Sequence, residues 1–193
     1  MMSLTTLFRC MTLGFVLATM PLVGGCSGDE IISWTEEVKL LDGRVITVTQ
    51  KRRIDMKRMP REAWLTFKLP EFGDKEIVWH ENLETQVLNI YQGKLYLVGY
   101  TYGIQEFHQY GNPPSLHVPY EYRDGRWVRT QVSEIPKAIY DTNMYPDNMA
   151  IKRLKHVSVS DKLEIFKDDA WMQHQRRVNP SYQSNFIKSE GRQ

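Results

Sequence analysis

The side chains best suited to acid–base or metal chemistry in this sequence are its five histidines, His80, His108, His117, His156 and His174. None belongs to an HExxH motif or to a pair with metal-ligand spacing, and no cysteine lies near them. His80 precedes Glu81, and His108 follows Glu106 by two residues, so either pair could form an acid–base unit. Such pairs also arise on the polar face of a strand, which is the interpretation we favour. The sequence therefore predicts no metal site, no cofactor and no catalytic residue.

A run of basic residues could bind anions. Between residues 51 and 61 only Asp55 opposes the cations Lys51, Arg52, Arg53, Lys57, Arg58 and Arg61. Such a run could contact anionic lipid headgroups or phosphorylated glycans near a membrane. No aromatic residue interleaves the run, so we favour the alternative, a solvated strand end and loop.

Tyrosines are concentrated in the middle of the chain, where nine of the ten lie between residues 91 and 145. Rigid aromatic rings bind sugars or peptides with little loss of entropy, and the candidates for such a surface are Tyr96, Tyr100, Tyr102 and Trp127. Ordinary packing on half-buried strands is the alternative that we favour. Alternation places Tyr96 and Tyr100 on one face of a strand and Leu95 on the other, so one face is expected to be interior. The pattern does not say which.

The beginning of the chain has the features of an export signal. Arg9 is followed by an uncharged apolar stretch, residues 11–23. This stretch is shorter than the roughly 20 residues of a transmembrane helix, and polar residues follow Cys26. An apolar stretch of this length after a positive charge is typical of a secretory signal.

Val23, Gly24, Gly25 and Cys26 resemble the lipobox of bacterial lipoproteins. The resemblance implies cleavage after Gly25 and acylation of Cys26, which becomes the first mature residue and anchors the protein in a membrane. Ser27 stands where an Asp would favour the inner membrane in that family, so the outer membrane is expected. The alternative is a buried core cysteine after an ordinary signal.

Without residues 1–25 the chain has 168 residues, enough for one domain with its own core. Its formal charge falls from +2 to about +1 with the loss of Arg9, so the composition does not favour nucleic acid as a partner. Cys10 is removed with the signal. Since Cys26 is the only other cysteine, neither a disulfide nor a thiolate metal site is expected.

Alternating patterns predict strands at residues 34–40, 44–50, 63–69 and 76–80. Asp42-Gly43 suggests a type I′ turn, and Gln92-Gly93 and Asp124-Gly125 suggest further hairpins. Pro119 predicts an edge position for its strand. A helix is expected over residues 160–174, capped by Ser160, with Asp161 near its positive end and an apolar face of Leu163, Phe166, Ala170 and Trp171.

These elements predict a mainly β fold, with antiparallel hairpins forming a sandwich or a partly open barrel and with a C-terminal helix. The expected organisation is a signal peptide at 1–25, a lipidated tether at 26–33, the β domain with its helix at 34–178 and a polar tail at 179–193.

The lipobox followed by the stretches WTEEVKLLDGRVITVTQ, EAWLTFKLP, VLNIYQGKLYLVGY and SEIPKAIYDTN resembles uncharacterised lipoproteins of proteobacteria. We expect a binding or assembly module at the periplasmic face of the outer membrane, with an envelope protein or a glycan as partner. The alternative is an envelope hydrolase that acts on peptidoglycan or another glycan, and a purely structural role is also open.

Overall fold

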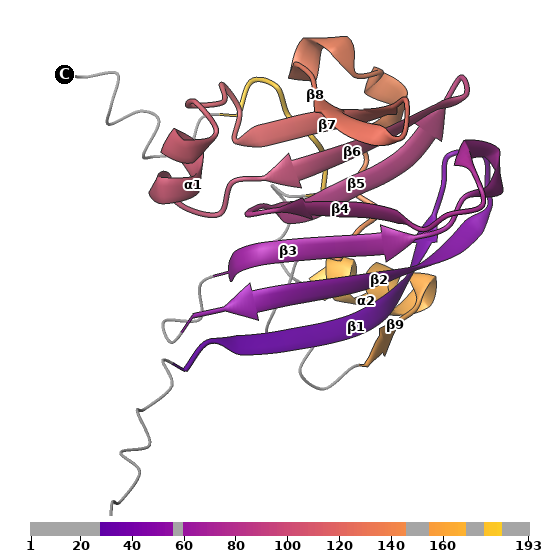
Figure 1. Cartoon of the computed structure of the whole chain (residues 1–193), viewed down its shortest axis with the longest axis horizontal. Coiled ribbons are helices and arrows are strands. Elements are labelled where there is room, and N and C mark those ends of the chain that lie inside the picture. The colour runs from indigo at the N-terminus through magenta and orange to yellow at the C-terminus, as the bar shows by residue number, and fades with distance from the viewer. Residues whose placement is uncertain (1–27, 56–59, 146–154, 169–175, 183–193) are drawn as a thin grey trace, which may run out of the picture.

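Two β-sheets make up most of the described chain (Figure 1). The computed structural model describes residues 28–55, 60–145, 155–168 and 176–182. The first sheet has the order β4-β3-β2-β1-β9 and contains β1 (Glu30–Lys39), β2 (Val45–Ile54), β3 (Pro60–Phe67), β4 (Ile77–Glu81) and β9 (His156–Val157). The second has the order β5-β6-β7-β8 and contains β5 (Glu84–Tyr91), β6 (Lys94–Tyr100), β7 (His117–Arg123) and β8 (Arg126–Arg129). Neighbouring strands are antiparallel except β1 and β9, which pair in parallel.

Two α-helices, α1 (Ile104–Gln109) and α2 (Val159–Asp168), accompany the sheets, together with 3₁₀ turns at Pro70–Phe72, Val132–Glu134 and Lys137–Ile139. The mainly β fold with a C-terminal helix is therefore confirmed. The helix α1 and the strand β9 have no counterpart among the predicted elements, because elements of six and two residues are too short to show a periodicity. No helix in the described part of the chain combines the length and the apolar character needed to cross a bilayer.

The strands of the first sheet extend beyond the predicted ranges. β1 begins at Glu30, so it includes residues that we predicted to be tether. β2 continues to Ile54 and carries the first three residues of the basic run. Along both strands the even-numbered side chains from Ile32 and Val48 onward are buried, and most odd-numbered ones face solvent. This alternation is the pattern of a sheet that packs on one face.

The hairpin turns contain residues with a positive φ. Gln92 and Gly93 have φ of 49° and 75°, and Asp124 and Gly125 have φ of 50° and 77°, as a two-residue type I′ turn requires. The first hairpin is also confirmed, but its turn is not type I′, because Asp42 is not among the residues with positive φ. There the Gly43 N–H donates to Leu40 O (3.0 Å), and only Gly43 takes the left-handed region, with φ 89°.

The main core lies between the two sheets. Leu65, Phe67 and Trp79 of the first sheet meet Leu97 and Tyr120 of the second. Trp79 and Tyr120 pack edge to face with ring centroids 5.8 Å apart. The edge strands β4 and β8 of the two sheets are joined by a hydrogen bond, in which Trp127 Nε1 donates to Val78 O (3.1 Å).

Both faces of β6 are buried, which corrects the expectation of one interior face. Leu95 and Leu97 face the core between the sheets. Tyr96 and Val98 pack on the opposite face against a second cluster that contains Ile135, Ile139, Tyr140 and Val178. Residues after β8 return across the outer face of the second sheet, so the surface that alternation would leave to solvent is covered.

Pro119 lies on an inner strand, which corrects the prediction of an edge strand, because β7 pairs with both β6 and β8. Pairing with β8 begins only at Tyr120. The carbonyl of Pro119 accepts a hydrogen bond from Thr130 N (3.0 Å), just past the end of β8. The N and O atoms of one residue point to the same side of an antiparallel strand, so the nitrogen of Pro119 also faces β8. Proline has no N–H to donate there, and it lies where the pairing of β7 with β8 ends.

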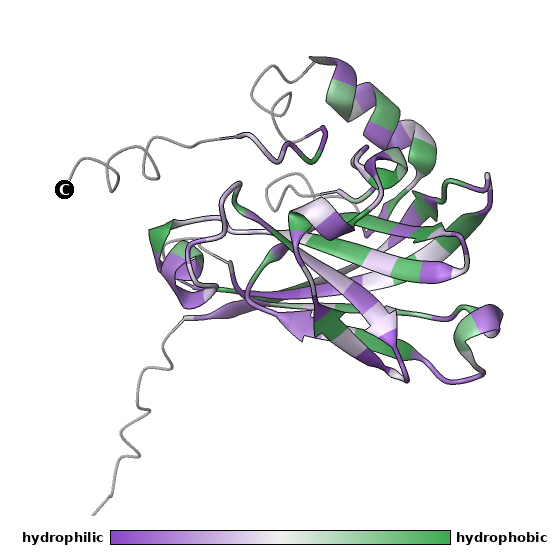
Figure 2. Ribbon diagram, turned by 90° about the horizontal axis from the view of Figure 1, so that it is seen from above, coloured by the Kyte–Doolittle hydropathy of each residue, from purple (hydrophilic) through white to green (hydrophobic). Residues whose placement is uncertain are grey.

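The helix α2 begins at Val159, one residue earlier than predicted. Ser158, not Ser160, is its cap: Asp161 N donates to Ser158 Oγ (3.1 Å), and Ser158 N donates to Asp161 Oδ2 (2.8 Å). This reciprocal pair is a capping box, and its hydrogen bonds lower the pKa of Asp161. Figure 2 shows polar and apolar residues alternating along α2. Leu163 of the predicted apolar face is exposed, and Ala170 and Trp171 lie outside the described residues.

Candidate functional site

One cavity lies at the edge of the sandwich where β1 and β5 come together. The Asn143 amide joins these strands: its Nδ2 donates to Lys39 O (3.0 Å) and to Leu88 O (2.7 Å), and its Oδ1 accepts from Leu88 N (2.9 Å). The Asn143 side chain thereby takes the place of backbone hydrogen bonds between β1 and β5. Because it satisfies three backbone groups, it holds the floor of the cavity rigidly.

Helix α2 forms the opposite wall and is held there by Lys162. The buried ammonium donates to Glu36 Oε1 (2.9 Å), to Asn143 O (2.6 Å) and to Glu37 O. A lysine ammonium has three donors, and all three are used. Lys162 therefore positions the helix and has no donor left for a ligand.

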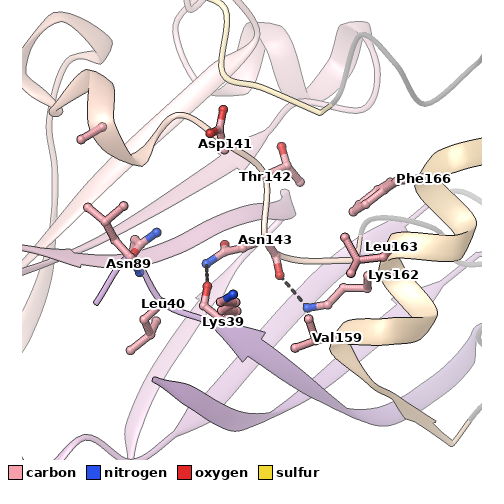
Figure 3. Close-up of a pocket in the computed structure, with 12 residues that line it drawn as sticks. Lys39, Leu40, Asn89, Asp141, Thr142, Asn143, Val159, Lys162, Leu163 and Phe166 are labelled. Carbon is pink, nitrogen blue, oxygen red and sulfur yellow. Dashed lines mark hydrogen bonds between the residues drawn. The ribbon is translucent and has the colours of Figure 1, made fainter. Parts of the chain in front are cut away.

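We call the resulting cavity the α2 groove, and Figure 3 shows the side chains that line it. Its volume is about 360 Å³. Its apolar lining comes from the end of β1, from the segment before Asn143 and from α2, and consists of Leu40, Leu41, Ala138, Val159, Leu163 and Phe166. Its polar lining consists of Lys39, Asn89, Asp141, Thr142, Asn143 and Lys162. Leu41 and Leu163 are 49% and 59% exposed, so the groove presents apolar side chains to solvent.

Two donors in the α2 groove are free to bind a ligand. Asn89 is only 5% exposed, and its Oδ1 accepts from Leu41 N (2.7 Å) and Ile90 N (3.1 Å), whereas its Nδ2 has no partner among the described residues. The Lys39 ammonium forms no ion pair within the described part of the chain. The Asp141 carboxylate at the rim faces Arg177 Nη1 at 3.0 Å.

Behind the α2 groove, a network of buried polar groups crosses the sandwich. The Glu36 carboxylate is fully buried and also accepts from Gln50 Nε2 (2.6 Å) and from Tyr145 N (2.7 Å). Gln50 Oε1 in turn accepts from Thr85 Oγ1 of β5 (2.7 Å). These bonds satisfy the charge of Glu36 and fix how β1, β2 and β5 cross.

The candidate basic patch does not form one surface, and the alternative that we favoured, a solvated strand end, is wrong at Arg52. Arg52 is fully buried, forms an ion pair with Glu84 (3.2 Å), and lies 5.3 Å from the ring centre of Trp34. It therefore belongs to the core. Of the others, Arg53 pairs with Glu62 and Asp29, Arg61 pairs with Asp55, and Lys51 lies over the ring of Trp64. Lys57 and Arg58 lie outside the described residues.

The four aromatic candidates do not form one surface. Tyr96 is buried in the cluster outside the second sheet, and burial raises the pKa of the Tyr100 phenol well above its usual range. Trp127 packs on the opposite side of that sheet, against Phe67 and Tyr122. Only Tyr102 is exposed. The four rings therefore do not line a common site, and Tyr96 and Trp127 serve ordinary packing, the alternative that we favoured.

The histidine–carboxylate pairs are also separated. His80 stacks on Trp64 with centroids 4.6 Å apart on the outer face of the first sheet, whereas Glu81, on the other side of β4, accepts from Tyr110 Oη (2.8 Å). On α1, His108 contacts Asn112 at the surface. Glu106 is buried instead, 3.3 Å from Asn82 Nδ2.

The remaining histidines lie apart from these pairs. His117 is buried, and desolvation lowers its pKa to about 4. His156 contacts Thr35 at 2.8 Å. His174, Gly25, Cys26 and Cys10 lie outside the described residues. Within the described ranges, no group of three or more histidine, cysteine or acidic side chains could hold a metal ion.

Sequence reasoning missed the α2 groove, although one signal was present. Asn89 interrupts an apolar strand and Asn143 follows a buried segment, and a buried amide needs partners. Their partners lie 48 and 104 residues away in sequence, at Leu41 and Lys39, and periodicity does not identify such pairs. No protein-family model, curated protein or solved structure matches this chain.

Proposed function

We propose that this chain is a lipid-anchored binding module at the periplasmic face of the bacterial outer membrane, and that its ligand enters the α2 groove. The observation that carries the proposal is the groove itself: its walls include exposed apolar side chains, and the Asn89 side chain in its lining has an amide nitrogen with no hydrogen-bond partner among the described residues. An apolar concavity with a few convergent polar groups is the usual form of a ligand site.

The position of the groove on the fold agrees with an anchor at Cys26. Four residue steps separate Cys26 from the start of β1, a span of at most about 14 Å. The groove lies at the other end of β1, roughly 30 Å away at about 3.4 Å per residue. An acylated Cys26 would hold the domain close to the bilayer and leave the groove at the far end, open to ligands in the periplasm.

In each of the two predicted histidine–carboxylate pairs, the histidine and the carboxylate lie on different sides of their element. We therefore rank binding above hydrolysis. General acid–base catalysis needs both groups within reach of one substrate. The groove supports binding through contacts that need no proton transfer.

The anchor is tested by expressing the full-length chain in a bacterium and fractionating the envelope. The wild type should be found in the outer membrane with an acylated Cys26 in mass spectra of the mature N-terminus. Cys26→Ala should remain unprocessed or become soluble, because acyl chains contribute about 0.8 kcal/mol per buried CH₂ to membrane binding. An unmodified Cys26 on a soluble wild-type protein would contradict the proposed anchor.

The site is tested by placing a photo-crosslinking amino acid at Leu163 in the same full-length protein. The matched control carries it at Val78, which is 51% exposed on the outer face of β4. Irradiated cells should yield a specific adduct from position 163 and not from position 78. Identical adducts from both positions, or none from position 163, would show that the groove is not the binding site.

A further inference from the structure

We propose that the ligand of the α2 groove is a single acyl chain that ends in a carboxylate. This inference rests on the proposed function, because it assigns a chemical class to the same site. The carboxylate is bound by Lys39 and Asn89, and the chain lies along the exposed leucines and Phe166.

The polar groups of the groove select a ligand that brings acceptors. Among the side chains that line the groove, Asn89 Nδ2 and the Lys39 ammonium are donors for which the described part of the chain supplies no partner. The amide oxygens are already used: Asn89 Oδ1 accepts from two backbone N–H groups, and Asn143 Oδ1 accepts from Leu88 N. The Asp141 carboxylate, at the exposed rim of the groove, is paired with Arg177 Nη1 at 3.0 Å. A ligand that offered donors would find no free partner among these atoms. An oxygen with a negative charge satisfies both the amide and the ammonium.

The apolar part of the lining extends to the surface. Figure 3 shows Leu40 on one side of the groove and Leu163 and Phe166 of α2 on the other. Leu41, which is about half exposed, also lines the groove. These side chains gain from removal of their surface from water, and a hydrocarbon chain needs no hydrogen bond from them. A sugar would leave hydroxyl groups facing these leucines without partners.

The size of the groove limits the occupant to one chain. Its volume of about 360 Å³ is at the small end of the range of roughly 300–1,000 Å³ that ligand pockets span. The acyl chains on Cys26 itself are poor candidates, since β1 separates its start from the groove by about 30 Å. The occupant is therefore a separate amphiphile with one chain, such as a free fatty acid.

The test is equilibrium dialysis of radiolabelled laurate against the full-length, lipidated protein in phosphatidylcholine nanodiscs, with empty nanodiscs as the blank. Dodecyltrimethylammonium, which has the same chain length and a cationic head, is the comparison probe. Laurate should bind about tenfold or more tightly than the cationic probe, because the free groups are donors and one is positively charged.

Three variants separate the head from the chain. Asn89→Asp keeps the Oδ1 acceptor for Leu41 N and replaces the free amide donor by an acidic oxygen, and Lys39→Glu reverses the charge at the rim. Each should weaken laurate binding about tenfold or more. Leu163→Glu should weaken both probes, because it places a charge on the apolar wall. The matched control Lys167→Glu, on the same helix but outside the groove lining, should leave binding within about twofold.

The outcomes distinguish the inference from the proposed function. Equal binding of the two probes, or unchanged laurate binding by Asn89→Asp and Lys39→Glu, overturns the carboxylate assignment. Laurate binding that Leu163→Glu does not weaken places the lipid elsewhere and also overturns it. If laurate does not bind but position 163 still forms a specific adduct in cells, the acyl assignment fails and the groove stands as a site for another ligand. If both experiments are negative, the proposed site fails as well.

Discussion

Replacing Lys162 by methionine should strongly destabilise the domain. Methionine has a similar size, so the substitution removes the ammonium with little change in packing. It leaves the fully buried Glu36 carboxylate without its cation, and it leaves the carbonyls of Glu37 and Asn143 without this donor. Removing one partner of a buried ion pair costs about 3–5 kcal/mol, because the other charge stays buried without compensation.

That cost is a large part of the stability of a typical domain, roughly 5–15 kcal/mol. At a denaturant dependence of about 2 kcal/mol per M, the midpoint of urea unfolding should fall by about 2 M. The measurement is urea unfolding followed by tryptophan fluorescence, on protein produced from residue 27 onward. Trp34 reports directly on this region because its indole Nε1 lies 3.4 Å from Glu36 Oε2.

The matched control is Lys167→Met on the same helix. Lys167 forms an exposed pair with Glu164 at 2.7 Å, and such pairs contribute about 0.5 kcal/mol or less. The double variant Glu36→Gln with Lys162→Met removes both charges and should be more stable than the sum of the two single effects predicts, by about 2 kcal/mol or more. If Lys162→Met lowers the midpoint no more than Lys167→Met does, the buried pair does not contribute as argued.

Three further outcomes follow from the structure and the sequence. Burial lowers the pKa of His117 from 6.5 to about 4, so the unfolded chain binds a proton in this range and the folded chain does not; stability should fall by about 3 kcal/mol as the pH drops from 7 to 4. A His117→Gln variant should lack that part of the loss in urea unfolding at several pH values, whereas parallel curves would contradict it. Gly99→Ala should cost about 1–3 kcal/mol, because its Cβ would lie 2.8 Å from Leu83 Cδ1; an unchanged melting temperature would show that Leu83 moves aside freely. The chain from residue 27 onward should unfold in one cooperative transition, as single domains of this size usually do. It contains no cysteine, so reducing agent should not change the midpoint, and a shift of that midpoint would contradict the reasoning.

Local chemistry determined much of the fold. Gly93, Asp124 and Gly125 adopt positive φ readily and therefore specify their hairpins locally, whereas Gln92 takes a positive φ of 49° at a cost of roughly 1 kcal/mol. Alternation in β1 and β2 identified strands, because successive side chains point to opposite faces. The mainly β class followed from these two signals. The mature N-terminus remains a prediction from residues 23–26 alone.

Only the tertiary structure decided which groups are buried and which meet at a site. Arg52 belongs to a basic run in sequence, but it is buried because Glu84, 32 residues later, brings a compensating charge to it. The outer face of β6 is buried because residues after β8 return over it. The α2 groove exists because two side chains donate to backbone carbonyls of β1 that are distant in sequence. Asn143 donates to Lys39 O, 104 residues away, and Lys162 donates to Glu37 O, 125 residues away. Periodicity records only how a segment alternates, whereas burial depends on which other segment covers each face, and that is decided by contacts far apart in the chain.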